Sequence, residues 1–316
     1  MTPLIKFIPQ GTRIDFMGKR AAGLLLSGLL LLASVVSLGV QGLSFGIDFA
    51  GGILIEARTP QPANLPEIRG TLGSLNLGDV GVTTFGEDGR DVAIRIGIQQ
   101  GGDEAQTAAL NRVREALGAD VDYRRVEVVG PKVGDELVRD GALAVGLSLL
   151  AIAVYIWFRF EWQFAVGGLL ALVHDIIVTL GLFSLLQLDF DLTTVAALLT
   201  IAGYSINDTV VAYDRVRENL RRYKKMDLPE LINRSLNEVL SRTLLTSGTT
   251  LLAVLALFLF GGSVLRGFSF ALIWGITIGT FSSLFVAMPV LLYLDVRRDE
   301  DEEEGGTNQE AQAEQP

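Results

Sequence analysis

The sequence contains no cysteine and only one histidine, His174. The lack of cysteine excludes a disulfide framework and thiolate metal sites, and it leaves the redox compartment open. A single histidine likewise excludes a multi-histidine metal site. The sequence also contains no GxGxxG motif, no Walker loop and no nucleophile elbow. These absences give no basis for soluble catalysis, so we expect neither an enzyme nor a bound cofactor or metal.

Charged residues are also scarce, at 20% of the 316 residues, whereas 49% are hydrophobic. Together with a mean hydropathy of +0.41, this balance is typical of an integral membrane protein with a soluble portion. The formal net charge of −10 is a local property, because residues 299–316 contain eight acids and no base. We predict that residues 296–316 form an acidic, disordered cytoplasmic tail, with docking to a partner as the alternative.

A first apolar run, Ala21–Val40, follows the basic pair Lys19 and Arg20 and is about twenty residues long. A signal peptide is the competing interpretation, but its core usually has roughly 7–15 residues and an A-x-A-like cleavage site follows it. This run is longer and has no such site. We therefore predict a cytoplasmic N-terminal segment at 1–20 and a retained transmembrane helix at 21–42.

Apolar sequence returns after the soluble region and dominates residues 138–295. Five further runs have the length needed to cross a membrane, or nearly so. They are Gly141–Phe158, Phe164–Leu186, Leu192–Tyr213, Leu244–Phe260 and Phe268–Leu294. The fourth of these reaches spanning length only if Arg242 lies inside the membrane, and Pro289 is expected to bend the fifth. The pattern Gly275-x-x-x-Gly279 predicts close helix packing. We therefore predict transmembrane helices two to six in this region.

Residues 43–137, between the first two runs, contain no segment long and apolar enough to span a membrane. Period-two alternation and turn residues predict strands here, whereas 3.6-residue periodicity predicts helices. The predicted strands are Phe49–Arg58, Val80–Phe85, Asp91–Ile98 and Val121–Val129, and the predicted helices are Leu65–Leu75 and Glu104–Leu117. The order βαββαβ predicts an extracytoplasmic ferredoxin-like α+β domain between the first two of six transmembrane helices.

The placement of lysine and arginine predicts the orientation of the chain in the membrane. Basic residues crowd the N-terminal segment, the loop from Asp214 to about Leu240, and the stretch after the last run. The loops expected on the opposite side, Gln187–Asp191 and Gly261–Gly267, contain one arginine in all. Both termini are therefore predicted to be cytoplasmic, with the α+β domain outside.

Asp208 lies inside an apolar run, where a carboxylate costs roughly 2.5–3.5 kcal/mol on insertion scales and usually has a partner. On the next span, Arg242 and Thr246 share one helical face, and the two helices run antiparallel because a cytoplasmic loop joins them. A contact between Asp208 and Arg242 is therefore expected. Two interpretations remain open: a structural ion pair, or a proton relay in which movement of the arginine changes the proton affinity of the aspartate. Asn207 and Ser247 are supporting candidates.

His174 and Asp175 form a second polar pair, near the middle of the run Phe164–Leu186. Polar residues at that depth usually face the interior of a helix bundle. A neutral histidine that is hydrogen-bonded to Asp175 or to a neighbouring helix is the simpler interpretation. The alternative is a supporting part in a proton path.

Four stretches of the chain carry a family resemblance. They are Phe45–Gly52 (FGIDFAGG), Val129–Leu137 (VGPKVGDEL), Gly203–Asn219 (GYSINDTVVAYDRVREN) and Ser241–Thr250 (SRTLLTSGTT). Together with the layout of six runs, they resemble the SecF family, the smaller membrane subunits of the bacterial SecD–SecF protein-export complex. The glycine-rich stretch alone would also suit SecD.

This resemblance implies half the architecture of a resistance-nodulation-division exporter, with SecD supplying the other six spans. It also implies that Asp208 and Arg242 belong to a proton path, which helps draw polypeptide outward after the SecYEG channel and the SecA motor have threaded it. A further essential carboxylate would belong to SecD. The implied partners are SecD, the translocating polypeptide, membrane lipid and, indirectly, SecYEG and SecA, without nucleic acid. The implied location is the bacterial cytoplasmic membrane.

Two other functions are weighed against this one. The first is a scaffold that recruits or stabilises translocon membrane proteins without moving protons. The second is a small-molecule exporter of the related superfamily, which is disfavoured because such exporters need larger outer domains than residues 43–137 provide.

Overall fold

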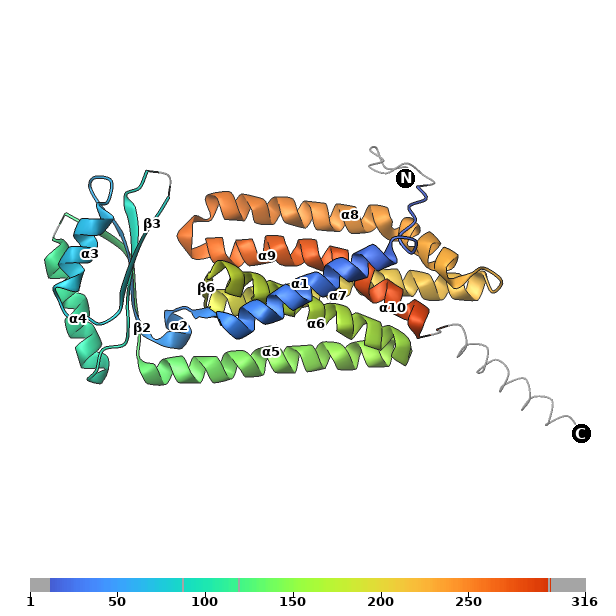
Figure 1. The fold of residues 1–316 in the computed structure, drawn as a ribbon, viewed down its shortest axis with the longest axis horizontal. Coiled ribbons are helices and arrows are strands. Elements are labelled where there is room, and N and C mark those ends of the chain that lie inside the picture. Colours follow the sequence, from blue (N-terminus) through green and yellow to red (C-terminus); the bar gives the residue numbers. More distant parts are fainter. Residues whose placement is uncertain (1–11, 87, 119, 295, 297–316) are drawn as a thin grey trace, which may run out of the picture.

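The computed structural model describes residues 12–86, 88–118, 120–294 and 296. Most of the predicted N-terminal segment, and all but one residue of the predicted acidic tail, lie outside these residues. Figure 1 shows a long helix bundle with a smaller α+β unit at one end. The two parts match the predicted division into a membrane portion and an inserted α+β portion.

Six helical segments of the described chain are long and apolar enough to cross a membrane. They are α1 (Arg20–Val40), α5 (Pro131–Arg159), α6 (Trp162–Leu186), α7 (Leu192–Arg222), α8 (Leu228–Phe260) and Val264–Tyr293. The last segment contains α9 (Gly262–Ser282) from Val264 onward, the π-helical turn η1 (Ser283–Ala287) and α10 (Met288–Tyr293). Leu294 apart, each predicted run lies inside one of these segments, so the prediction of six spans is confirmed.

Three helices extend well beyond the apolar runs that predicted them. Helix α5 begins at Pro131 rather than at Gly141, and α8 begins at Leu228 rather than at Leu244. Helix α7 ends at Arg222 rather than at Tyr213. Hydropathy marks only the residues inside the hydrocarbon, whereas a helix continues into water for as long as its backbone hydrogen bonds continue. The predicted boundary between the α+β portion and the membrane, at residues 137 and 138, therefore falls inside α5.

The disturbance expected at Pro289 takes the form of the π-helical turn η1, which directly precedes α10. Proline has no N–H, and its ring clashes with the carbonyl four residues earlier, here that of Phe285. A π turn inserts one residue into the helix and so changes the hydrogen bonding at that point. Ser283, at the start of the turn, is buried in the bundle.

The α+β unit contains β2 (Gly52–Arg58), α3 (Leu65–Gly73), β3 (Val80–Phe85), β4 (Asp91–Ile96), α4 (Gly102–Leu117) and β5 (Asp122–Val129). The strands form one antiparallel sheet in the order β3-β4-β2-β5. The βαββαβ order confirms the predicted ferredoxin-like domain. Ile55 of β2 and Ile94 of β4 are fully buried in a core shared with Leu72 of α3 and Val113 of α4. Figure 1 shows both helices on the face of the sheet turned away from the bundle.

The predicted strand Phe49–Arg58 begins three residues too early. Phe49 belongs to a short helix, α2 (Ile47–Ala50), and β2 starts only at Gly52. Gly51 and Gly52 have φ values of +70° and +119°, which residues with a Cβ rarely adopt. A Cβ on Gly52 would also collide with the carbonyl oxygen of Ile96. The glycine pair therefore ends the helical turn and allows β2 to approach β4 closely.

Three kinds of contact join the α+β unit to the near end of the bundle. The short strand β1 (Ser44–Phe45) pairs in parallel with β6 (Asp189–Phe190), between α6 and α7. The carboxylate of Asp48 accepts a hydrogen bond from the backbone N–H of Leu192 at 2.9 Å. Arg95 of β4 forms an ion pair with Asp189. These contacts hold the open face of the sheet toward the membrane portion.

The bundle has inner and outer helices. At least half of the spanning part of α6, α7 and the last segment is buried, whereas less than a quarter of α1, α5 and α8 is buried. A Cβ on Gly275 of α9 would collide with Ile201 of α7, and a Cβ on Gly279 would lie 3.1 Å from that of Ser205. The predicted close packing at Gly275 and Gly279 is confirmed, and it brings the polar residues of α7 and α9 together.

Candidate functional site

Asp208 lies on α7 where this helix meets α8 and α9, and only 5% of the residue is exposed. It belongs to the inner face of α7, because Ser205 and Ala212, one turn to either side, are also buried. The Oγ of Ser247 on α8 donates to Asp208 Oδ2 at 3.4 Å. The same hydroxyl shares a 2.9 Å hydrogen bond with Oγ1 of Thr280 on α9. Asp208 is therefore a buried carboxylate with one long hydrogen bond.

Arg242 does not form the predicted ion pair with Asp208. It is exposed and, among the residues that the structure describes, it lies within 4.0 Å of no carboxylate oxygen. Arg242 precedes Ser247 by about 7.5 Å along the axis of α8, at roughly 1.5 Å per residue. The arginine can therefore influence the carboxylate without touching it.

The candidate residues of α8 differ in how far they face α7. Ser247 and Val254 are buried, whereas Arg242 is exposed. The hydroxyl of Thr246 donates to the backbone carbonyl of Arg242 at 3.1 Å and so bonds within its own helix. One residue is a rotation of about 100° in a helix of 3.6 residues per turn. Ser247 is the buried donor to Asp208, and the half-buried Thr246, one residue earlier, also lies near this carboxylate.

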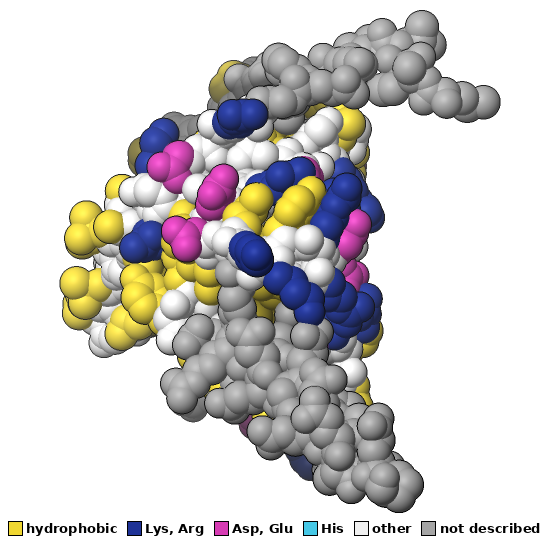
Figure 2. All heavy atoms as spheres, turned by 90° about the vertical axis from the view of Figure 1, so that its right-hand side faces the viewer, with side chains coloured by type: hydrophobic (Ala, Val, Ile, Leu, Met, Phe, Trp, Pro, Cys, Tyr) yellow, Lys and Arg dark blue, Asp and Glu magenta, His cyan; other side chains and the backbone are white. Residues whose placement is uncertain are grey.

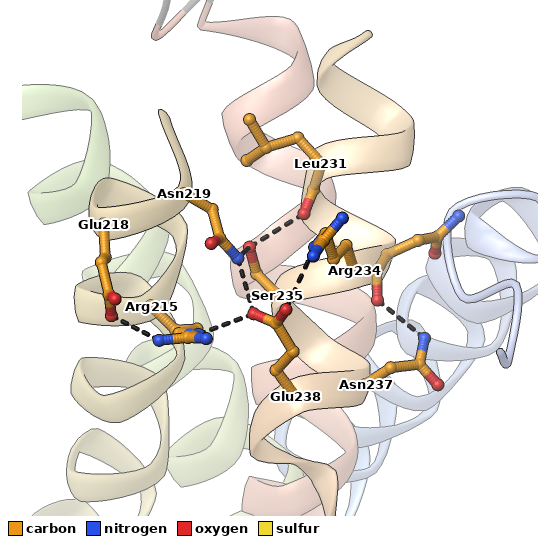
Figure 3. Close-up of polar contacts among 9 residues, drawn as sticks. Arg215, Glu218, Asn219, Leu231, Arg234, Ser235, Asn237 and Glu238 are labelled. Carbon is orange, nitrogen blue, oxygen red and sulfur yellow. Dashed lines mark hydrogen bonds and ion pairs between the residues drawn. The ribbon is translucent and has the colours of Figure 1, made fainter. Parts of the chain in front are cut away.

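Two neighbours of Asp208 on α7 lie outside the site. Asn207 is exposed, because it is rotated by about 100° from Asp208. Arg215 binds Glu238 on α8 at 2.7 Å and Glu218 at 2.5 Å, and Figure 3 shows its guanidinium directed between the two carboxylates. Two further side chains donate to Glu238: Asn219 at 2.8 Å and Arg234 at 3.1 Å. Arg215 therefore ties α7 to α8 and is not the counter-charge of Asp208.

His174 and Asp175 on α6 form a second polar centre, with 2% and 0% of their surfaces exposed. The Nδ1 of His174 lies 2.9 Å from Oδ1 of Asp175, which is one of the two hydrogen-bond partners considered for this histidine. The other oxygen, Oδ2, accepts from the hydroxyl of Ser205 on α7 at 2.6 Å and from that of Ser282 on α9 at 2.7 Å. Asp175 therefore joins three helices through its two oxygens.

Ser247 was a candidate, but the other hydroxyls at these centres were not predicted: those of Ser205, Thr209, Thr280, Ser282 and Ser283. Ser205 precedes Asp208 by one helical turn, and this spacing could have predicted that it shares the inner face of α7. The hydroxyls of Thr209 and Ser283 share a 2.8 Å hydrogen bond between α7 and η1. Nothing in the spacing predicted which helix each hydroxyl would meet.

The chemistry available to these residues is the holding and passing of protons. A carboxylate, an imidazole and hydroxyls can each donate or accept a proton, and a nearby arginine favours the ionised carboxylate. Nε2 of His174 is buried and has no hydrogen-bond partner among the described residues. Across the same residues, no group of three His, Asp or Glu side chains is placed to hold a metal ion.

Two family models match the chain. The C-terminal model of the protein export membrane proteins SecD and SecF matches residues 109–297, and the SecD/SecF GG motif matches residues 36–63. The protein translocase subunit SecF of Rickettsia akari (strain Hartford) is 48% identical over 91% of this chain and 94% of its own length. The chain belongs to the SecF family. The SecF of Cereibacter sphaeroides is 46% identical over 93% of each chain.

A solved relative shares the fold. The crystal structure of SecDF from Thermus thermophilus, a translocon-associated membrane protein, matches with a TM-score of 0.82 at 36% sequence identity. The match covers 92% of this chain and 40% of the SecDF chain, so this chain spans less than half of SecDF. The resemblance deduced from the four stretches is confirmed, and the chain is a multi-pass membrane protein of a family of transport components rather than enzymes. Asp175, Asp208 and Arg242 all lie in the matched C-terminal region.

Proposed function

We propose that this chain is a proton-coupled accessory subunit of the Sec translocase, acting with SecD to promote late steps of polypeptide export across the cytoplasmic membrane. Its relatives are named as translocase subunits, and it matches one part of SecDF. SecD would supply the rest of the working assembly. SecYEG, SecA and the translocating polypeptide would be engaged through that complex.

The observation that carries this proposal is the unpaired state of Asp208. The residue is buried, its hydrogen bond from Ser247 is 3.4 Å long, and no cation of the described chain lies within 4.0 Å of it. A purely structural carboxylate at this depth would be expected to have a close partner, because an ionised group costs several kcal/mol to hold in an apolar interior without one. A carboxylate without a fixed partner can gain and lose a proton as its surroundings change.

Arg242 supports the same proposal from the outer side of α8. It is exposed, and most of the spanning part of α8 lies outside the buried core. We propose that SecD packs on α8 and α5, the two least buried spans. A shift of SecD against α8 would then move the arginine relative to Asp208 and alter how strongly the carboxylate holds a proton.

His174 and Asp175 have a different place in the proposal. Asp175 has a polar partner at each oxygen and connects α6, α7 and α9. Since Ser205 is one turn from Asp208 on α7, Asp175 fixes the helix that carries the proposed proton carrier. We assign Asp175 and His174 as positioning residues.

The proposed orientation has both termini in the cytoplasm. In Figure 1, α1 begins and α10 ends at the end of the bundle far from the α+β unit. Figure 2 views that end and shows lysine and arginine side chains gathered over it. The positive-inside tendency supports a cytoplasmic position for this end and an external position for the α+β unit.

The experiment that tests the proposal is Asp208→Asn in the full-length chain, co-expressed with SecD and assayed for protein export into membrane vesicles. We expect the variant to assemble with SecD and to lose the stimulation of export by the proton gradient. Asn207→Ala changes the exposed neighbour and is the matched control, which should export as the wild type does. Wild-type, gradient-dependent export by Asp208→Asn would reject the proton role and favour the scaffold.

A further inference from the structure

We propose that an arginine-lined hollow at the end of the bundle far from the α+β unit binds the phosphate of an anionic phospholipid headgroup. The hollow has a volume of about 410 Å³ and lies between the end of α5 and the last turns of α7. Its lining is almost wholly charged: Arg159, Asp214, Arg217, Glu218, Arg221 and Arg222.

The ion pairs around the hollow leave positive charge unused. Arg159 pairs with Asp214 at 2.7 Å, and Arg217 pairs with Glu161 at 2.6 Å. The third carboxylate, Glu218, is engaged by Arg215 at 2.5 Å.

Arg221 and Arg222 remain without a carboxylate within 4.0 Å in the described part of the chain, and both are exposed. Arg221 follows Asp214 and Arg217 at helical spacing, so it continues their face of α7 toward the hollow. A guanidinium presents a planar fork of donors that matches two phosphate oxygens. The unused donors therefore suit a phosphate monoanion better than a cation or an apolar ligand.

Exposed aromatic side chains place the hollow at the depth of lipid headgroups. Trp157 and Phe158, next to Arg159 on α5, are 62% and 86% exposed, and Trp162, at the start of α6, is 48% exposed. Tryptophan is enriched where a membrane meets water. A guanidinium nitrogen of Arg217 donates to the carbonyl of Arg159 at 3.4 Å, which holds this aromatic turn against α7. A soluble anion site would not require such a border of exposed tryptophans.

The same arginines could serve two purposes other than lipid binding, and the experiment must distinguish these from it. Cations in the last turn of a helix interact favourably with its dipole, and they also favour a cytoplasmic position. Neither use requires a ligand. The acidic segment 299–316 is a second candidate occupant of opposite charge.

The test is binding of phosphatidylglycerol to the purified full-length chain, measured by native mass spectrometry. We expect saturable binding of phosphatidylglycerol, and binding about 25-fold weaker in Arg221→Gln/Arg222→Gln, since a basic residue near an anionic surface contributes about a fivefold change in affinity. Lys132→Gln/Arg139→Gln removes the same charge from exposed positions at the other end of α5 and is the matched control. The control should bind as the wild type does.

Four outcomes would overturn the proposal. The first is that phosphatidylglycerol binds Arg221→Gln/Arg222→Gln as tightly as it binds the wild type. The second is that zwitterionic phosphatidylcholine binds the wild type as well as phosphatidylglycerol does. The third is that inorganic phosphate alone binds at the same concentrations, which would indicate a soluble-anion site. The fourth is that removal of residues 299–316 strengthens phosphatidylglycerol binding more than about fivefold, which would show that the tail occupies the hollow.

Discussion

Asp175 and Asp208 are buried carboxylates on adjacent inner helices of the bundle. They differ in their hydrogen bonding, so burial alone does not tell whether such a carboxylate is structural or functional. Asp175 is fully buried, and its oxygens lie 2.6–2.9 Å from three polar side chains on three helices. Asp208 is almost as buried, yet its hydrogen bond from Ser247 is 3.4 Å long and Arg242 stays at a distance. A well-bonded buried group rigidifies a structure, whereas a poorly bonded one can change its protonation at lower cost. The comparison therefore separates a positioning carboxylate from a proposed proton carrier.

The largest effect that this comparison predicts is on stability at Asp175. Asp175→Ala should lower the free energy of unfolding by about 3–5 kcal/mol, because it leaves His174, Ser205 and Ser282 without their buried partner. Unfolding in detergent, followed by loss of helical circular dichroism, measures this change. Asp175→Asn keeps the shape and should cost less. A loss below about 1 kcal/mol in Asp175→Ala would show that the hydroxyls find other partners.

Asp208 should behave in the opposite way. Asp208→Asn should change the free energy of unfolding by less than about 1 kcal/mol, since only one long hydrogen bond is altered. The same variant should lose proton-dependent export. Unfolding and export should be measured on one preparation, because a variant that unfolds easily would show that Asp208, like Asp175, has a structural role.

A smaller effect is predicted at Arg242. Arg242→Lys should keep most of the gradient-dependent export, whereas Arg242→Gln should lose it, because Arg242 makes no bidentate contact and only its positive charge is available to act on Asp208. Neither variant should change the free energy of unfolding by more than about 0.5 kcal/mol, as is usual for exposed positions. Equal losses of export in both variants would instead require the planar guanidinium.

The smallest effect concerns an exposed carboxylate outside the membrane, Asp15. The N–H of Gly18 and the amide of Asn233 donate to Asp15 Oδ1 at 2.7 and 2.8 Å, and these bonds, the former first, lower the pKa of Asp15 below its ordinary value. A carboxyl whose pKa is lowered by folding stabilises the folded state at a pH above its ordinary, unfolded-state pKa. This contribution is lost as the pH falls through the folded-state pKa.

The melting temperatures of the wild type and Asp15→Asn, measured from about pH 6 to about pH 3, test this sign. The small difference between them should shrink as the pH falls. A difference that grows on acidification would show that Asp15 stabilises the fold in its protonated form.

Hydropathy and periodicity were enough to predict the six spans, the βαββαβ order and the candidate residues, because both are local properties of the chain. The family resemblance likewise rests on local motifs. Local hydropathy could not determine the helix ends, since α5, α7 and α8 remain helical beyond the apolar runs.

Which polar residues meet depends on how the helices pack and on how each helix is rotated. A rotation of about 100° per residue separates Ser247 from Thr246 and Asp208 from Asn207, so a face predicted one residue off exchanges a buried side chain for a more exposed one. The closeness of Ser205 and Ser282 to Asp175 depends on how α6, α7 and α9 pack, which Gly275 and Gly279 permit. Sequence could name both carboxylates. Only packing between helices distinguishes Asp175, with its three partners, from Asp208, with one long hydrogen bond.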